Sequence, residues 1–176
     1  MFKYLIQDLL ATLKYAPYGI VIGAVLLLVV HGINYWRRKQ GKPPWRLLAS
    51  VSLFTYFALM VIITFLSRDE GSAAGMDLQI GSGLNINARN DAYLVENVLL
   101  FIPYGFCFAW YLKQKGILFS AFFVGFATSF CIEVLQLITG RGIFQLDDII
   151  TNTIGCVLGA MIFQIPARIV WRIMRN

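Results

Sequence analysis

Acidic, amide and basic residues interrupt the apolar segment CIEVLQLITGRGIFQLDDIITNTIG, residues 131–155. A carboxylate in apolar surroundings can act as a general acid or base, and grouped carboxylates can bind a divalent cation. An arginine beside them can neutralise their charge or bind an anionic ligand. The residues of this segment suited to such chemistry are Glu133, Gln136, Arg141, Asp147, Asp148 and Asn152.

Helical spacing places several of these residues on shared faces. Glu133 and Gln136 are three positions apart, so on a helix they point the same way. Asp148, Asn152 and Gly155 follow one another at spacings of four and three, so they share a face of a second helix. The segment therefore predicts two helices whose polar faces can meet.

The elements that carry these residues have the composition of membrane spans. The chain is 59% hydrophobic and only 14% charged, whereas soluble domains are about half apolar and about a quarter charged. About 20 mostly apolar residues span a bilayer. We therefore expect one all-α membrane domain, residues 1–176, with about five transmembrane helices at 16–36, 47–66, 97–112, 117–138 and 149–165.

The basic residues predict how these helices are oriented. Ten of the 15 lysines and arginines lie after the first, third and fifth predicted spans, and none of the nine acids lies there. Because cytoplasmic loops of membrane proteins are enriched in lysine and arginine, the N-terminus is predicted outside and the C-terminus in the cytoplasm. Since the positive charge gathers at the membrane surface, the net charge of +6 does not predict a nucleic-acid partner.

Two regions outside the spans have patterns of their own. Residues 1–15 have apolar residues at helical spacing, which fits either an interfacial helix or an extension of the first span. The external loop 67–96 contains DLQIGSGLNIN, in which apolar residues alternate around Gly81-Ser82-Gly83. This alternation predicts a small β-hairpin that packs on the membrane domain or on a partner.

The predicted topology brings polar groups of three spans to one depth in the outer half of the membrane. Asn97 begins the third span, and Glu133 lies roughly 8–10 Å below the outer end of the fourth, at about 1.5 Å per residue. Arg141 is the expected counter-ion of Glu133 or Asp148. The predicted ligand-binding residues are Asn97, Glu133, Gln136, Arg141, Asp147, Asp148 and Asn152. The alternative is structural, with interhelical hydrogen bonds and acids that cap a helix N-terminus.

Small residues in the spans predict close packing. Gly155-x-x-x-Gly159 and Gly19-x-x-x-Gly23 are expected to pack within the bundle or to form a face for a homo-oligomer. Pro103 and Gly105 are expected to loosen the third span. His31 is expected to be a packing or interfacial residue. The cysteines at 107, 131 and 156 have the spacing of neither a disulfide framework nor a metal site.

The segments ENVLLFIPYGFCFAWYL and SFCIEVLQLITGRGIFQLDDIITNTIGCVLG resemble the VanZ-like family. The residues that carry the resemblance are Asn97, Phe101, Pro103, Gly105, Glu133, Gln136, Arg141, Asp147, Asp148, Asn152 and Gly155. It covers roughly residues 95–160. The resemblance implies a multi-pass protein of the bacterial cytoplasmic membrane that contributes to resistance against the lipoglycopeptide teicoplanin. It assigns neither a structure to loop 67–96 nor a mechanism.

Three functions follow from these expectations. In the first, an outward polar pocket binds a lipid-linked cell-wall precursor or a lipoglycopeptide, without a cofactor. In the second, a membrane-embedded enzyme acts on a lipid-linked substrate with Glu133 and Asp147 or Asp148 as acid, base or ligands of a divalent cation. This function is weakened because no activated nucleophile such as a Ser-His pair is evident. The third is a proton-coupled lipid transporter, which lacks a matching acid in the cytoplasmic half.

Overall fold

The computed structural model describes residues 1–71, 73, 75–84 and 87–175, with side chains as far as residue 165. Helices dominate, and two very short strands lie in the connections. In chain order the elements are α1 (Phe2–Thr12), η1 (Leu13–Tyr15), α2 (Ala16–Lys39), α3 (Leu47–Val61), η2 (Ile62–Leu66), β1 (Met76–Asp77), α4 (Ala88–Leu112), α5 (Ile117–Thr139), β2 (Phe144–Gln145) and α6 (Leu146–Arg175). η1 is a 3-10 turn and η2 a π-helical turn.

Five helical stretches of the described chain are long and apolar enough to cross a membrane, which confirms the predicted helical membrane bundle. They are Phe2–Lys39, Leu47–Leu66, Ala88–Leu112, Ile117–Thr139 and Leu146–Ile165. The first, third and fifth stretches begin earlier than the predicted spans, and polar first turns account for the early starts of α4 and α6. The Asn87 side chain caps α4 by accepting hydrogen bonds from the amides of Arg89 and Asn90. Two acids in the first turn of α6 favour an early start of that helix.

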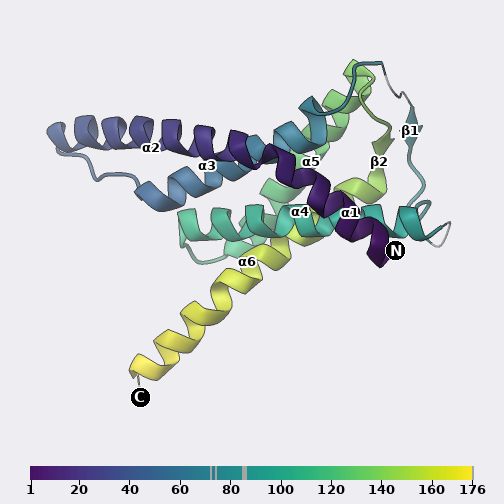
Figure 1. Cartoon of the computed structure of the whole chain (residues 1–176). Coiled ribbons are helices and arrows are strands. Elements are labelled where there is room, and N and C mark those ends of the chain that lie inside the picture. The colour runs from purple at the N-terminus through teal and green to yellow at the C-terminus, as the bar shows by residue number, and fades with distance from the viewer. Residues whose placement is uncertain (72, 74, 85–86, 176) are drawn as a thin grey trace.

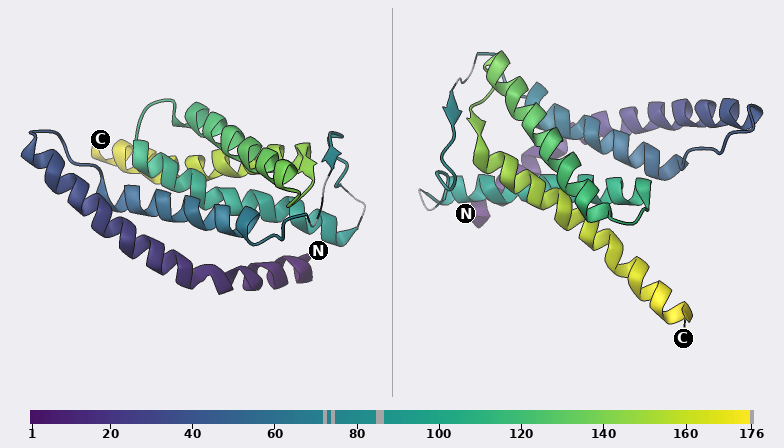
Figure 2. Two further views of the ribbon diagram at one scale, coloured as in Figure 1. Left: turned by 90° about the horizontal axis from the view of Figure 1, so that it is seen from above. Right: turned by 180° about the vertical axis from the view of Figure 1, so that it is seen from behind.

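The first fifteen residues continue into the first span. Figure 2 shows α1 and α2 as one long, gently curved helical segment along the edge of the bundle, joined by η1. α1 also contacts α4, where the Arg89 guanidinium lies 5.6 Å from the ring centroid of Tyr4 and 5.4 Å from that of Tyr93. The helix is thus continuous from α1 into α2, while its two readings, an interfacial helix or an extension of the span, stay predictions.

The connections alternate between the two ends of the bundle. Figure 1 shows the connections 40–46 and 113–116 at the end that the C-terminus approaches, and the N-terminus, β1 and β2 at the other end. We call the end with the N-terminus the outer end. This alternation agrees with the predicted topology, while the sidedness itself stays a prediction from the charge distribution.

The centre of the bundle is the contact between α4 and α6, which depends on glycines. A Cβ on Gly105 would lie 1.9 Å from the carbonyl oxygen of Cys156, and a Cβ on Gly159 would lie 1.9 Å from that of Ile102. A Cβ on Gly155 would lie 2.3 Å from the Val98 carbonyl oxygen. The two backbones are therefore in direct contact, as in other membrane helix pairs with small residues at the interface.

The other predicted glycine pair serves the same purpose. Gly19 and Gly23 of α2 face Leu59 and Thr55 of α3. Both Gly-x-x-x-Gly faces are thus covered by helices of the same chain, and oligomerisation stays a prediction without an assigned face. Near this layer, the Tyr56 hydroxyl donates to the Leu100 carbonyl oxygen at 2.8 Å, in the part of α4 that Pro103 interrupts.

The predicted β-hairpin is wrong. β1 pairs in parallel with β2, so that Met76 lies opposite Phe144 and Asp77 opposite Gln145. Ahead of β1, the Ala73 amide donates to the Gly140 carbonyl oxygen at 3.0 Å. Leu84 lies in a turn, and the remainder of the predicted second arm, residues 85–86, lies outside the described residues. A segment with alternating apolar residues can pair with any strand that has an unpaired edge. Here the pairing strand lies in the connection between α5 and α6.

Candidate functional site

Two carboxylates from different helices lie together at the outer end of the bundle. Glu133 of α5 is 2% exposed, and its Oε2 accepts a hydrogen bond of 3.0 Å from the backbone amide of Gln145. Asp148 of α6 accepts a hydrogen bond of 2.8 Å from the side-chain amide of Asn97 on α4. Asp148 is close enough for its charge to act on Glu133. The sequence prediction that α4, α5 and α6 contribute polar groups at one depth is thus consistent with this geometry.

A cation near these carboxylates is Arg68, an exposed residue that sequence reasoning missed; among the described residues it forms no ion pair with either carboxylate. The charge of its guanidinium acts on both Glu133 and Asp148. Its Nη1 lies beside Gly142, where a Cβ would stand only 2.7 Å away. Gly142 therefore leaves the space that the guanidinium occupies. The sequence did contain a signal for Arg68. This residue follows the second predicted span by two positions, on the side of the membrane predicted for the polar residues.

Arg141 does not pair with Glu133 or Asp148 among the described contacts, which corrects the expected ion pair. Its Nη2 lies 3.6 Å from Glu70 Oε2, and its Nη1 donates to the Arg68 carbonyl oxygen at 2.9 Å. The guanidinium also stacks over the Phe65 ring, 5.2 Å from the centroid. Arg141 thus ties the connection after α5 to the end of the second span, and holds the backbone that carries Arg68.

Gln136 and Asp147 have partners that point to structural roles. The Gln136 amide nitrogen donates to the Thr64 carbonyl oxygen at 2.8 Å, within the π-helical turn η2. The Asp147 carboxylate accepts hydrogen bonds from the amides of Gly81 at 2.7 Å and Gly83 at 3.1 Å. Asp147 therefore fastens the external loop to the start of α6, instead of joining the paired carboxylates.

A second polar layer lies one helical turn deeper. The Asn152 amide nitrogen donates to the Ser129 hydroxyl at 2.8 Å, and both residues are at least 95% buried. The Asn152 side-chain oxygen has no hydrogen-bond partner among the described residues. Below this layer, the hydroxyls of Tyr104 and Thr128 are 3.1 Å apart. Ser129 and Thr128 were not predicted, since a hydroxyl inside an apolar helix is usually satisfied by its own backbone.

Comparison with known proteins places this arrangement in a family. The family profile described as VanZ/LLP1 matches residues 52–169. The chain belongs to the VanZ-like family. It is similar to Protein VanZ of Enterococcus faecium, with 34% identity over 70 residues, which cover 40% of this chain and 43% of that protein. The similarity thus spans less than half the length of either protein. No solved structure matches the chain.

The VanZ-like region includes every predicted site residue, and the structure divides them by location. Asn97, Glu133 and Asp148 meet beside Arg68, whereas Arg141 and Asp147 hold the loop above them. Phe101 is fully buried and packs edge-on against Tyr104, with ring centroids 5.9 Å apart. Within the described residues, no group of three or more histidines, cysteines or acids has the arrangement of a metal site.

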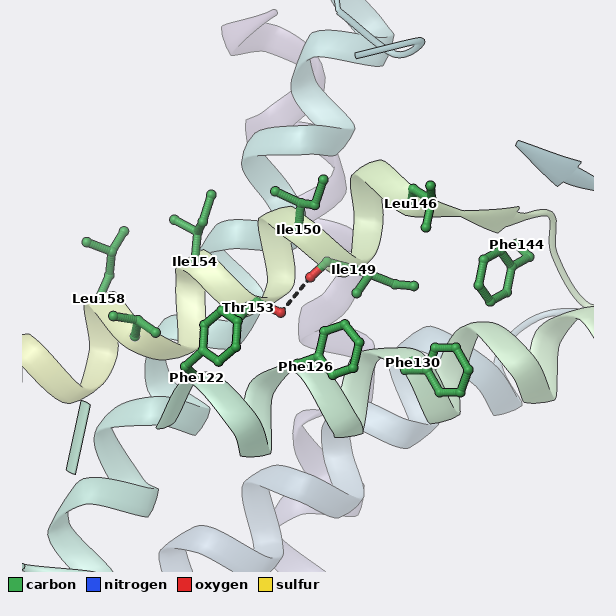
Figure 3. A pocket seen from close by; sticks show the side chains of 11 residues that line it. Phe122, Phe126, Phe130, Phe144, Leu146, Ile149, Ile150, Thr153, Ile154 and Leu158 are labelled. Atoms are coloured by element: carbon green, nitrogen blue, oxygen red, sulfur yellow. Dashed lines mark hydrogen bonds between the residues drawn. The ribbon is translucent and has the colours of Figure 1, made fainter. Parts of the chain in front are cut away.

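An apolar groove runs along the outside of the VanZ-like bundle between α5 and α6 (Figure 3), and sequence reasoning did not predict it. Its volume is about 590 Å³. One wall is the row Phe122, Phe126 and Phe130, whose successive rings are nearly parallel at 6.5 Å and 6.1 Å. The other wall is α6 between Leu146 and Leu158. The spacing of four between the phenylalanines was the available signal, because it places all three on one helix face.

Proposed function

We propose that this VanZ-like chain binds an amphiphile, either a lipid-linked cell-wall precursor or a lipoglycopeptide, at the outer surface of the bacterial cytoplasmic membrane, and contributes to teicoplanin-type resistance. The observation that supports it is the Glu133 carboxylate, 2% exposed inside the bundle, with the Asp148 carboxylate near it and the Arg68 guanidinium within range of both charges. Ionisable groups inside membrane spans are energetically expensive, so they usually mark functional sites.

The chemistry of these three side chains suggests which head group they would bind. A guanidinium donates paired hydrogen bonds to phosphate or carboxylate oxygens. Carboxylates accept hydrogen bonds from amines and sugar hydroxyls. One cation with two carboxylates is a poor site for a bare diphosphate, and favours a ligand with one anionic group among several amines or hydroxyls. Glycosylated and peptidic head groups have this composition.

Access to the carboxylates would require movement of the external loop. Gly71, Ala73 and residues 75–77 lie beside residues 139–145 through backbone hydrogen bonds and strand pairing, and the Asp147 carboxylate accepts hydrogen bonds from Gly81 and Gly83. These contacts are few, and they join short strands that are marginal on their own. A ligand head group that replaces the Arg141 and Asp147 contacts would open the site and release this segment.

The test is teicoplanin susceptibility of bacteria that express the wild-type chain or one of three variants, Glu133→Gln, Asp148→Asn and Arg68→Gln. The matched control is Asp69→Asn, because Asp69 is exposed at the same end of the bundle. We expect the wild type and the control to raise the inhibitory concentration several-fold, and the three variants to lose that protection at equal abundance in the membrane.

Two results would contradict the proposal. One is protection by all three variants at the wild-type level. The other is that the three variants disappear from the membrane, while an uncharged replacement that restores folding, such as Glu133→Met, also restores protection. That second result would assign the charged cluster to helix association, which polar residues also perform in membranes.

A second candidate function is an enzyme of the outer leaflet, with Glu133 and Asp148 as the acid and base. It is favoured by the closeness of the two carboxylates, which come from different helices. Asp147 is the weaker candidate of the two aspartates, because both of its oxygens accept hydrogen bonds from the loop. Mass spectrometry of lipid-linked precursors from cells with the wild type or Glu133→Gln tests this function. Identical precursors in the two strains would argue against catalysis.

A further inference from the structure

The groove between α5 and α6 begins beside the paired carboxylates. Phe144, which lines the groove at its outer end, precedes Gln145, whose amide donates to Glu133. On α5, Glu133 lies three residues beyond Phe130, so it continues the aromatic row towards the outer end. On α6, the groove residue Ile149 directly follows Asp148. The groove and the polar cluster are therefore consecutive parts of the same two helices.

The length of the groove matches one leaflet. Its wall on α6 extends from Leu146 to Leu158, which at about 1.5 Å per residue is roughly 18 Å. The hydrocarbon core of a bilayer is about 30 Å thick, so the groove descends from the outer end to slightly beyond the middle. A hydrocarbon chain with its head at the outer surface would follow this path.

The lining of the groove is almost entirely apolar, which favours a hydrocarbon occupant over a polar one. Thr153 is the one lining residue with a hydroxyl, and that hydroxyl donates to the Ile149 carbonyl oxygen at 2.7 Å. The groove thus offers no donor to a polar partner, and its flat aromatic wall suits a flexible chain.

We propose that this groove binds one hydrocarbon chain of the amphiphile whose head group lies at Arg68, Glu133 and Asp148. The inference rests on the proposed function for the identity of the head group. The binding of a hydrocarbon chain rests on the groove itself. Burial of methylene groups in the groove would supply affinity, and the polar cluster would select the head group. The proposed ligands are therefore amphiphiles whose hydrocarbon chain enters the groove laterally from the bilayer.

The experiment is photolabelling of the full-length protein in phosphatidylglycerol vesicles. A trace of phosphatidylglycerol with a diazirine in one acyl chain is the probe, and labelled peptides are mapped by mass spectrometry. The test variant is Ile154→Trp, which places an indole in the groove. The control is Ile162→Trp, because both isoleucines lie on α6 and are 47% exposed, but only Ile154 lines the groove.

We expect labels to concentrate on residues 122–130 and 149–158 in the wild type and in Ile162→Trp. Labelling there should fall about ten-fold in Ile154→Trp, equivalent to about 1.4 kcal/mol of lost binding free energy. Uniform labelling of all lipid-facing helices would overturn the inference, as would equal labelling of the two variants. If the chain gives no protection against teicoplanin but labelling remains concentrated and sensitive to Ile154→Trp, the proposed function fails and the groove assignment stands.

Discussion

The side-chain amide of Asn97 donates a 2.8 Å hydrogen bond to the carboxylate of Asp148, 51 residues further along the chain. This bond joins the outer ends of α4 and α6, and it orients one of the two carboxylates at the candidate site. Because both partners are partly buried, the loss of one leaves the other poorly satisfied. The bond therefore connects the stability of the bundle to the geometry of the site.

Replacement of Asn97 by alanine should lower the thermal stability of the purified protein. The variant removes the donor to Asp148, and an unsatisfied buried acceptor typically costs about 1–3 kcal/mol. Thermal unfolding in detergent, followed by circular dichroism, measures the change. Asn90→Ala is the control, since Asn90 is also partly buried on α4 but contributes its backbone amide, not its side chain, to the cap of α4. Equal melting temperatures for the two variants would mean that the Asn97 bond contributes no net stability.

Gly159→Ala should separate α4 from α6. The added Cβ would lie 1.9 Å from the Ile102 carbonyl oxygen, so the two helices must move apart, and overpacking of this kind costs about 1–3 kcal/mol. Gly32→Ala is the matched control, because a Cβ at Gly32 meets no atom within 4 Å. Alanine is favoured over glycine in a helix by about 0.5–1 kcal/mol, so the control should be slightly stabilised. Opposite signs of the two shifts in melting temperature are the expected result.

Asp147→Asn should release the external loop and leave the helices intact. An amide has a single oxygen, so it cannot accept the Gly81 and Gly83 hydrogen bonds as the carboxylate does. We expect faster hydrogen–deuterium exchange in residues 78–84 and unchanged exchange in α4 and α6. Asp69→Asn, an exposed position near the start of the external loop, serves as the comparison. Unchanged exchange at residues 78–84 would show that the loop is held by other contacts.

The Asp77 carboxylate should titrate below its ordinary range. The Ser82 hydroxyl and the Gln79 amide donate to it, and these hydrogen bonds lower its pKa. Because the folded-state pKa is depressed, any stabilisation by this turn is present above the unfolded pKa of about 3.9 and disappears as the pH falls through the folded value. Carbon-detected NMR of Asp77 measures the midpoint, which should rise in Ser82→Ala. An unchanged midpoint would remove the hydroxyl as the cause.

The spans and the depth of the polar cluster could be predicted from sequence because both depend on local periodicity. A window of about 20 apolar residues identifies a span, and the rise per residue places Glu133 and Asn97 near the same level. The glycine faces of α2 and α6 were equally visible, although the sequence could not choose between a helix of the same chain and a second copy as the partner. Each of these patterns lies within a single helix, so it can be recognised without knowledge of residues far away in the sequence.

The counter-ion and the strand pairing depend on contacts between distant segments, and no local pattern encodes them. Arg68 and Arg141 both lie at the outer end, and only the course of the backbone after α5 decides which one reaches the carboxylates. In the same way, β1 pairs with residues 144–145 across the two helices α4 and α5. The prediction of a hairpin assumed that the nearest strand would be the partner, which parallel pairing does not follow.

The backbone contact between α4 and α6 also constrains how the molecule can move. At Gly105, Gly155 and Gly159 the two helices approach so closely that neither can rotate about its axis without a collision between main-chain atoms. The helices α4 and α6 must therefore move together as one rigid unit. Any conformational change that admits or releases a ligand is therefore left to α5, the α2–α3 pair and the loop tied by Asp147, and the outer carboxylates would change their spacing mainly through displacement of α5.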